Sequence, residues 1–420
     1  MKEKKIRNKP LPFEFPGANW YGKEEETAVI KVIRNKSPFR YYGPNLTYET
    51  EKFEKEFAKF IGTKYALGVN SGTQALAVAM AALGIGPGSE VIIPGYMWIS
   101  IPASIIRLGA IPVLAEIDET FTIDPDDIEK KITSRTKLIV AVHMSGAPCD
   151  MKRILKIAEN YNIPVLEDCS QAIGAEIEGK KVGSFGIMAT YSFQLNKILT
   201  TGEGGMITTN SLHLFKRADA IHDLGYPRVK GRLITKNTPY SLWGFGGRMC
   251  EIIGAIGRVQ LKKVPKIIKA MRKAKKKIKE GISDIKEIKF RKLVDEKGDT
   301  GAFLILILPD SKIAKRFAEE MNKENLYAGL SPTIRVCDFG MHVYYNIHSL
   351  VKKHSNSPDG FPWTLEANKE LVYNYDKGAL PRSDELMEKS IIIPVPSIMS
   401  KTDIDDVIKG IHKIASKLFK

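Results

Sequence analysis

The stretch KYALGVNSGTQALAVAMAALGIGPGSEVIIP (64–94) decides the fold class. It opens with a short apolar run, KYALGV (64–69), which is typical of a buried strand. The alanine-rich segment QALAVAMAALG (74–84) predicts a buried helix, and a glycine-rich turn leads from it into a second apolar run, EVIIP (90–94). A strand, a helix and a strand in this order predict a βαβ unit, and therefore a parallel sheet.

The same alternation continues along the chain. Further strands are predicted at 111–118, 136–144 and 164–169, and the amphipathic segment 151–162 predicts a helix. This order of elements predicts an α/β fold with a mainly parallel mixed sheet flanked by helices. Because ligands bind such sheets at the carboxyl ends of the strands, polar residues just after a strand are the first candidates for a site.

The last third of the chain follows a different pattern. Apolar runs at 288–293, 302–308 and 391–396 predict strands mixed with helices, and an amphipathic helix is predicted over 403–419. This pattern is typical of a smaller α+β domain. A chain of 420 residues exceeds the size of a single core. We therefore expect two domains, the first with a proline-rich N-terminal arm; they cover residues 1–260 and 261–420.

The chain is strongly basic, with a formal net charge of +16. Much of this excess lies in the segment LKKVPKIIKAMRKAKKKIKE (261–280), where lysines surround an apolar stripe at helical spacing. The stripe consists of Val264, Ile267, Ile268, Met271 and Ile278. A helix docked on the core explains this segment, so we expect no nucleic-acid partner, although a positive field would help to collect phosphorylated substrates.

The cysteines and the apolar runs limit where the protein works. The four cysteines are far apart and form no CxxC pair, which is typical of unpaired thiols in a reducing compartment and gives no zinc-ligand spacing. No apolar run approaches the ~18 residues of a membrane helix, and the N-terminus lacks the apolar segment of a signal peptide. We therefore expect a cytoplasmic protein with no membrane partner and no metal.

The first candidate cluster, Asn70-Ser71-Gly72-Thr73, lies between a predicted strand and a predicted helix. A helix N-terminus presents free N–H groups that bind phosphate, and Gly72 lets the backbone approach a ligand closely. Ser71 and Thr73 add hydroxyl groups. The same residue types also make ordinary helix caps, so this cluster alone does not separate a phosphate site from an N-cap.

The second cluster, Glu167-Asp168-Cys169-Ser170-Gln171, ends an almost wholly apolar strand. A carboxylate there needs a partner, because burying it alone costs several kcal/mol. In a functional site the partner is a metal, a histidine or a protonated ring nitrogen. In a structural site it is an arginine or a loop N–H group.

The third cluster places Lys197 between an aromatic strand, Tyr191-Ser192-Phe193, and the glycine-rich turn TTGEGG (200–205). A lysine set back from solvent has a lowered pKa, which frees its amine for Schiff-base chemistry. The alternative is a surface lysine beside a hairpin.

Together the three clusters supply an anion cradle, a carboxylate and a shielded amine, which are the groups that pyridoxal phosphate (PLP) requires. With these residues assembled, the sequence resembles the DegT/DnrJ/EryC1/StrS family of fold-type-I PLP-dependent aminotransferases, which aminate keto sugars and cyclitols. The resemblance runs from about residue 13 to the C-terminus. Its best-matching parts are NSGT, GIGPGSEVIIP, VHMSG, EDCSQAIGA, SFQLNK and TTGEGG.

The resemblance implies a role for each matching position. Lys197 would carry PLP as a Schiff base and act as the catalytic acid and base. Asp168 would keep the pyridinium nitrogen protonated, and Gln171 would contact the phenolic oxygen of the ring. Trp98 matches an aromatic residue that stacks on the ring, with core packing as its alternative, and His143 matches a structural histidine below the site. The phosphate would be bound by Ser71, Gly72, Thr73 and Ser192.

One position departs from the family pattern. The family has an Asn in a G-x-N-x-R-M stretch, and this Asn reaches the cofactor phosphate across a dimer interface. The corresponding segment here is GFGGRM (244–249), in which Gly246 takes the place of the Asn. A backbone N–H group or a residue of the 230–243 loop is the candidate replacement. The resemblance still implies a homodimer with shared active sites.

The resemblance also implies the reaction: glutamate or glutamine donates an amino group to a keto sugar, most commonly nucleotide-linked, in the biosynthesis of amino sugars, cell-surface polysaccharides or secondary metabolites. The FRYYGPN, FQLNK and PRSDELM segments resemble members that act on cyclitols or on an eight-carbon sugar acid. The stretch from about 331 to 384 predicts long loops. Candidate substrate-binding residues are His342, Tyr344 and Arg248.

Two further alternatives stay open. One is a PLP-dependent sugar dehydratase or deoxygenase, although family members that catalyse dehydration keep a histidine in place of Lys197. The other is a non-enzymatic protein that binds partners through its basic surface. A binding protein of that kind has no need of Lys197.

Overall fold

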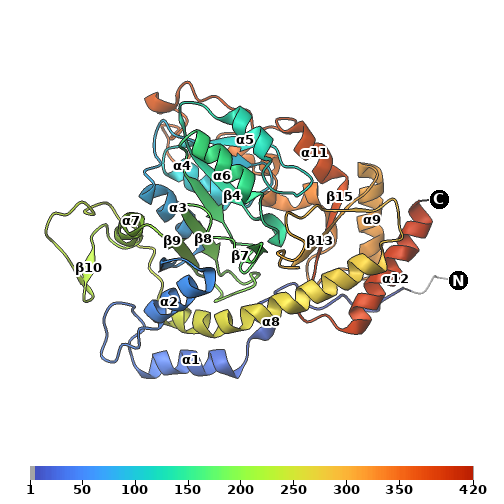
Figure 1. Cartoon of the computed structure of the whole chain (residues 1–420), viewed down its shortest axis with the longest axis horizontal. Helices are drawn as coiled ribbons and strands as arrows, with labels where there is room; N and C mark the ends of the chain where they lie inside the picture. The colour runs from blue at the N-terminus through green and yellow to red at the C-terminus, as the bar shows by residue number, and fades with distance from the viewer. Residues whose placement is uncertain (1–4, 420) are drawn as a thin grey trace.

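A seven-stranded mixed sheet forms the centre of the large domain in the computed structural model, which describes residues 5–419 (Figure 1). The strand order is β1-β9-β8-β5-β4-β2-β3. Neighbours from β8 to β3 pair in parallel, and β9 is antiparallel to both β1 and β8. The strands are β1 (Tyr65–Val69), β2 (Glu90–Pro94), β3 (Ile111–Ala115), β4 (Thr136–Val142), β5 (Val165–Asp168), β8 (Met188–Ser192) and β9 (Gly205–Thr209).

Helices cover both faces of this sheet, which confirms the predicted α/β fold. On one face, α3 is apolar all round because it lies between the sheet and the outer helices α4 and α7. On the other face, Phe53 and Phe57 of α2 pack with Tyr191 and the first half of α8. The main helices are α2 (Glu49–Ile61), α3 (Gly72–Ala82), α4 (Ser100–Arg107), α5 (Pro125–Lys131), α6 (Met151–Asn160), α7 (Leu212–His222) and α8 (Glu251–Gly281).

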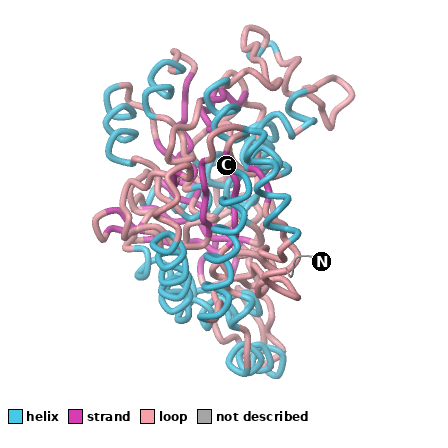
Figure 2. Tube along the Cα trace, turned by 90° about the vertical axis from the view of Figure 1, so that its right-hand side faces the viewer, coloured by secondary structure: helices cyan, strands magenta, loops and turns pink. Residues whose placement is uncertain are grey.

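The small domain is an antiparallel four-stranded sheet in the order β12-β13-β15-β14, covered by helices (Figure 2). Leu304 and Leu306 of β13 pack on Phe317 of α9, and Ile411 of α12 lies in the same cluster. The elements are β12 (Lys289–Phe290), β13 (Phe303–Ile307), β14 (Ile334–Arg335), β15 (Ser390–Pro394), α9 (Ser311–Lys323), α11 (Pro381–Glu388) and α12 (Lys401–Leu418). The short helix α10 (His348–Val351), between β14 and α11, packs on the large-domain core through Leu350.

The predicted division at residues 260 and 261 falls inside a continuous helix. The first half of α8 packs on the large-domain core through Val264 and Ile267, and Ala274 and Ile278 pack on the small-domain core. All the stripe residues predicted for the basic segment are buried. The helix is therefore shared by both domains, because its apolar face is long enough to serve two cores.

Two segments cross between the domains. The stretch after β14 consists of 3₁₀ turns and loops, and it returns to the large domain, where Val343, Ile347 and Tyr375 are buried. The N-terminal arm crosses the small domain, where Leu11 joins the core, and then leads into α1 (Lys23–Arg34). Among residues 5–419, no helix combines the length and apolar character that a membrane span requires.

Candidate active site

A cavity of about 380 Å³ opens at the carboxyl ends of β4, β5 and β8, beside the N-terminus of α3. This is the edge of the sheet at which ligands bind in such folds. The cavity brings together all the cofactor-binding residues predicted from the sequence, and His342 joins them; these residues are Ser71, Gly72, Thr73, Trp98, Asp168, Gln171, Ser192 and Lys197.

The first turn of α3 forms the polar floor of this cavity. Ser71 is the N-cap, and its Oγ accepts the Gln74 N–H at 3.1 Å, so its hydroxyl both caps the helix and lines the cavity. A Cβ on Gly72 would lie 2.6 Å from the Ser192 Cβ, which leaves room only for glycine. The helix N-terminus, with the Thr73 hydroxyl beside it, suits a phosphate group.

Asp168 ends β5, lines the cavity and is 5% exposed. One of its oxygens accepts the Ser170 N–H at 3.0 Å. Burial raises the pKa of Asp168, while Ser170 and the nearby Lys197 lower it. A carboxylate in this position suits a cationic ring nitrogen, because such a partner offsets the cost of burying the charge.

Lys197 lies in the turn that joins β8 to β9, where its N–H donates to the Gln194 carbonyl at 3.0 Å. Its own carbonyl accepts the Gly17 N–H from the N-terminal arm at 3.1 Å. Desolvation lowers the pKa of Lys197, and Asp168 opposes that shift. The side chain therefore has the shielded environment that makes a lysine amine nucleophilic.

A chain of hydrogen bonds fixes the orientation of Gln171. Its Oε1 accepts the Ser145 N–H at 3.0 Å, so its Nε2 is the atom that faces His342 Nε2 at 3.3 Å. His342 Nδ1 lies 3.0 Å from the Phe339 carbonyl and must donate to it, which leaves Nε2 as an acceptor. Burial lowers the pKa of His342 to about 4, which keeps this ring neutral.

Arg291 anchors the turn that carries Ser145. The guanidinium donates to the carbonyls of Met144 and Ser145 at 2.8 and 3.2 Å. Its Nε donates to the Thr120 carbonyl at 2.6 Å. Ser145 has a left-handed φ of 53°, which this buried guanidinium helps to hold. A residue of the small domain thus supports the wall of the cavity.

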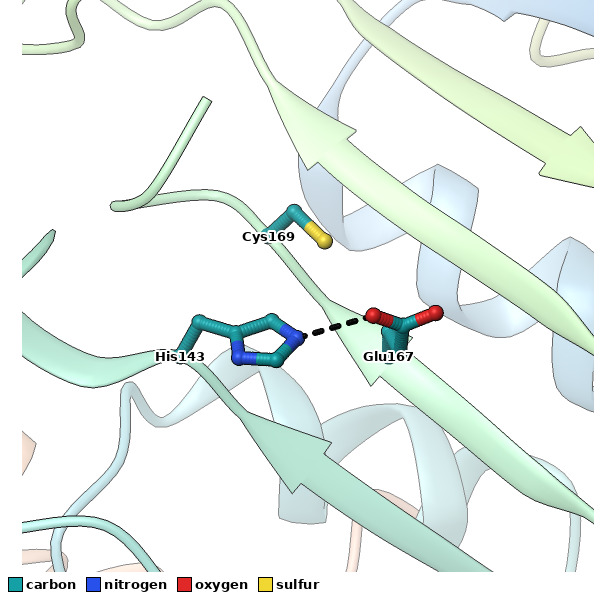
Figure 3. A group of neighbouring side chains, drawn as sticks. All are labelled: His143, Glu167 and Cys169. Carbon is teal, nitrogen blue, oxygen red and sulfur yellow. Dashed lines mark hydrogen bonds and ion pairs between the residues drawn. The ribbon is translucent and has the colours of Figure 1, made fainter. Parts of the chain in front are cut away.

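His143, Glu167 and Cys169 form a buried group whose ligand atoms lie within 4.8 Å of one another (Figure 3). The Glu167 carboxylate already accepts four hydrogen bonds, one from His143 Nε2 at 3.0 Å and three from backbone N–H groups of Gly183, Phe185 and Gly186. His143 Nδ1 accepts the Cys149 N–H at 3.0 Å. These contacts use the lone pairs that a metal needs, so the group is a structural network.

The structure shows which of the predictions for Trp98, Tyr344 and Arg248 hold. Trp98 is 40% exposed and its ring centre lies 4.6 Å from that of His342, so the core-packing alternative for Trp98 is wrong. Tyr344 does not reach the cavity: its ring is buried, and its hydroxyl donates to Asp384 at 3.1 Å. Arg248 pairs with Asp223 and lines neither this cavity nor the one beside it.

The backbone around Gly246 offers no substitute for the missing Asn. The N–H groups of Phe245, Gly246 and Gly247 all donate to carbonyls of the same chain, at 2.7 to 2.8 Å. Of the two candidate replacements, only the side chains of the neighbouring loop therefore remain.

Three residues in or around the cavity were not predicted from the sequence. Ser100 follows Trp98 by two positions and bonds Thr73 Oγ1 at 2.7 Å, and Asn196 precedes Lys197. Arg291 lies more than a hundred residues from every residue it holds. Only the position of Asn196, next to the lysine, was a usable signal.

The fold and the cavity define a class: fold-type-I transferases that use pyridoxal phosphate, whose anion cradle, ring carboxylate and lysine all have fitting residues here. The chain belongs to the DegT/DnrJ/EryC1/StrS aminotransferase family, which it matches over residues 21–348.

The chain is also similar to individual aminotransferases and to a GDP-perosamine synthase. GDP-perosamine synthase of Caulobacter vibrioides is 45% identical over 214 residues, which are 51% of this chain and only 56% of that protein. The dTDP-3-amino-3,6-dideoxy-alpha-D-galactopyranose transaminase of Aneurinibacillus thermoaerophilus is 30% identical over 396 residues, 94% of this chain and 96% of its own. The crystal structure of an aminotransferase from Psychrobacter cryohalolentis has a TM-score of 0.78 at 27% identity and covers 95% of this chain and 98% of its own.

Proposed function

We propose that this protein is a PLP-dependent aminotransferase that moves an amino group from glutamate or glutamine to a keto sugar. One observation carries the proposal: Lys197, Asp168 and the N-terminus of α3 line a single cavity. The two relatives named above, a GDP-perosamine synthase and a dTDP-amino-sugar transaminase, support a nucleotide-linked sugar as the acceptor.

In this proposal, each group of cavity residues has its own chemical role. Bound PLP would supply an electron sink for the carbon that loses a proton. Lys197 Nζ takes the proton from the α-carbon of the donor, and its lowered pKa keeps a larger share of the amine free to act as a base. Asp168 holds the positive charge at the ring nitrogen, and the N-terminus of α3, with Ser71 and Thr73, binds the phosphate.

The active sites belong to a homodimer in this proposal. Among the described residues, Lys197 is the only lysine or arginine that lines the cavity, although a phosphate dianion has to be bound there. A long loop, residues 226–241, carries the hairpin of β10 (Arg228–Val229) and β11 (Arg232–Leu233) away from the body of the molecule (Figure 1). Large apolar side chains around this loop are exposed, with Trp243 at 92%, which is typical of an interface.

The proposed location is the cytoplasm. All four cysteines are free in the structure, and three of them are buried. Free thiols are typical of a reducing compartment such as the cytoplasm.

The proposal is tested with the visible spectrum of the purified protein and PLP, recorded before and after glutamate is added. We expect the absorbance of the lysine-bound cofactor to shift to that of the pyridoxamine form, and borohydride reduction before the glutamate is added should attach the cofactor to the peptide that contains Lys197. A bound cofactor that neither glutamate nor glutamine converts would overturn the reaction class. Attachment to any other lysine would overturn the site.

A further inference from the structure

A second cavity, of about 280 Å³, adjoins the cofactor cavity. The two cavities share four residues: Gln171, Asn196, Lys197 and His342. The remaining walls of the second cavity come from the N-terminal arm, from β13, β14 and β15 of the small domain, and from the turn at 330–332. A molecule in this cavity reaches the Lys197 side chain, so the cavity is placed to hold a substrate of whatever reaction occurs there.

The walls of this second cavity combine apolar surface with a few hydrogen-bonding groups. Phe303, Ile334 and Ile392 supply apolar surface, and Glu14, Asn196 and Ser331 supply polar groups. Among the described residues that line it, Lys197 is the only lysine or arginine, and the His342 ring is neutral. Within one chain, a carboxylate or phosphate here would meet no lysine or arginine except Lys197, and burying an unpaired anion is costly.

Glu14 projects from the N-terminal arm into this cavity and is held in place. Its Oε1 accepts the Ser331 hydroxyl at 2.6 Å, and its Oε2 accepts the Leu330 N–H at 3.3 Å. The arm itself is tied to the lysine loop by the Gly17 N–H, 3.1 Å from the Lys197 carbonyl. An ionised carboxylate has about four acceptor positions, so two of them remain for a ligand.

We propose that the second cavity binds the uncharged, hydroxylated ring of the ketone acceptor, and that Glu14 selects this ring by accepting a hydrogen bond from one of its hydroxyl groups. The apolar walls then pack on the C–H faces of the ring, and the negative charge of Glu14 disfavours carboxylates in the same position. Any phosphate that the acceptor carries lies outside this cavity. The inference rests on the proposed function, because it concerns the acceptor of that reaction.

The test compares two ketones on the holoenzyme and on the Glu14→Gln variant. The first is 2-keto-myo-inositol, an uncharged and fully hydroxylated cyclic ketone, and the second is 2-oxoglutarate, a dicarboxylate. Calorimetry on the pyridoxal form, which cannot aminate a ketone, measures binding alone. Single turnover of the pyridoxamine form measures the half-saturating concentration of each ketone during reaction.

We expect Glu14→Gln to weaken the binding of 2-keto-myo-inositol about tenfold, which corresponds to one charge-assisted hydrogen bond. Binding of 2-oxoglutarate should stay the same or become tighter, because a repulsive charge is gone. Ser331→Ala, which removes the hydroxyl that holds Glu14, should give a smaller loss for the cyclic ketone. Glu26→Gln is the matched control, since Glu26 is an exposed carboxylate on α1 that lines neither cavity.

Equal effects of Glu14→Gln on both ketones, or no effect on either, would overturn the inference. So would a wild-type protein that does not bind the cyclic ketone. Failure of the proposed function looks different: wild-type enzyme would then convert neither ketone, while calorimetry would still show Glu14-dependent binding of the ring. If the cyclic ketone is converted and Glu14→Gln binds it as tightly as wild type, the function stands and the assignment of the cavity is wrong.

Discussion

Gly17 is the point at which the N-terminal arm touches the backbone that carries Lys197. A Cβ at this position would lie 2.8 Å from the Ile198 carbonyl oxygen and 2.9 Å from that of Lys197. Both contacts are too short for carbon and oxygen, so Gly17→Ala must displace the arm or the lysine loop. We expect the free energy of unfolding to fall by about 1–3 kcal/mol and PLP to attach to Lys197 more slowly.

Denaturant unfolding and the rate at which the cofactor absorbance appears measure these two effects. Gly22→Ala is the control, because a Cβ on Gly22, only five positions along the arm, would have no neighbour within 4 Å. If Gly17→Ala behaves like Gly22→Ala in both measurements, the arm does not support the lysine.

His342 gives the site a distinct pH dependence. Burial lowers its pKa to about 4, while an unfolded histidine titrates near 6.5. Between these values the unfolded chain binds a proton that the folded chain does not bind, so the residue's contribution to stability is lost as the pH falls from about 6.5 to about 4. The loss is on the order of 3 kcal/mol, and it is complete below the folded pKa.

Unfolding free energies of wild type and His342→Gln, measured at several pH values from 7 to 4, isolate this contribution. All other titrating groups are common to the two proteins, so the difference between their curves belongs to His342. We expect wild type to lose stability relative to the variant across this range. Parallel curves would show that His342 is solvated and not held neutral against Gln171.

At the scale of elements, the turn at 144–146 connects the two domains through Arg291. Replacing this residue by methionine removes three donated hydrogen bonds, including the one to the carbonyl of the buried Ser145. We expect Arg291→Met to lower the free energy of unfolding by about 2–4 kcal/mol and to weaken PLP binding, because the Ser145 N–H positions Gln171.

Arg272→Met is a matched control for this prediction. Arg272 donates to the carbonyls of Gly298 and Asp299 and does not contact the turn. Its loss should lower stability while the affinity for PLP, measured by fluorescence titration, stays near the wild-type value. Equal loss of affinity in both variants would mean that PLP binding follows general stability and not the turn.

Local sequence patterns predicted most strands of the large-domain sheet. They did not predict the positions of side chains that depend on partners distant in the sequence. The strand at 90–94 begins and ends where its apolar run does, because every one of its side chains is buried. Tyr344 was expected to face a substrate, yet its hydroxyl meets Asp384, forty residues further along the chain. Whether a polar aromatic residue in a loop points inward depends on such a partner, which no local pattern records. Arg291 was missed for the same reason.

At the scale of the whole molecule, α8 and the N-terminal arm connect the two domains that together form the site. The cofactor cavity is built from the large domain, and the second cavity needs the arm and the small-domain sheet. Lys197 lies where the two cavities meet. Substrate binding is therefore expected to depend on domain packing more strongly than cofactor binding does.

The proposed sharing of sites between subunits is testable with two inactive variants. One is Lys197→Ala, and the other replaces residues 226–241 by a short glycine linker. The ends of this loop are adjacent, since the Leu242 N–H donates to the Gly225 carbonyl at 2.6 Å, so the loop can be removed without spanning a gap. Each variant alone should fail to convert its cofactor with glutamate.

Mixing the two variants after mild dissociation should restore activity if the loop of one subunit completes the site of the other. In a mixed dimer one site then carries both defects and the other carries neither, so an equal mixture should regain about a quarter of the wild-type activity. Light scattering checks that the mixture is dimeric.

If the mixture stays inactive, each loop serves the site of its own subunit, because a mixed dimer would then hold one defect in each site. If the loop variant alone is active, the phosphate is bound without the loop, and the cation missing from the cavity has to come from elsewhere on the partner.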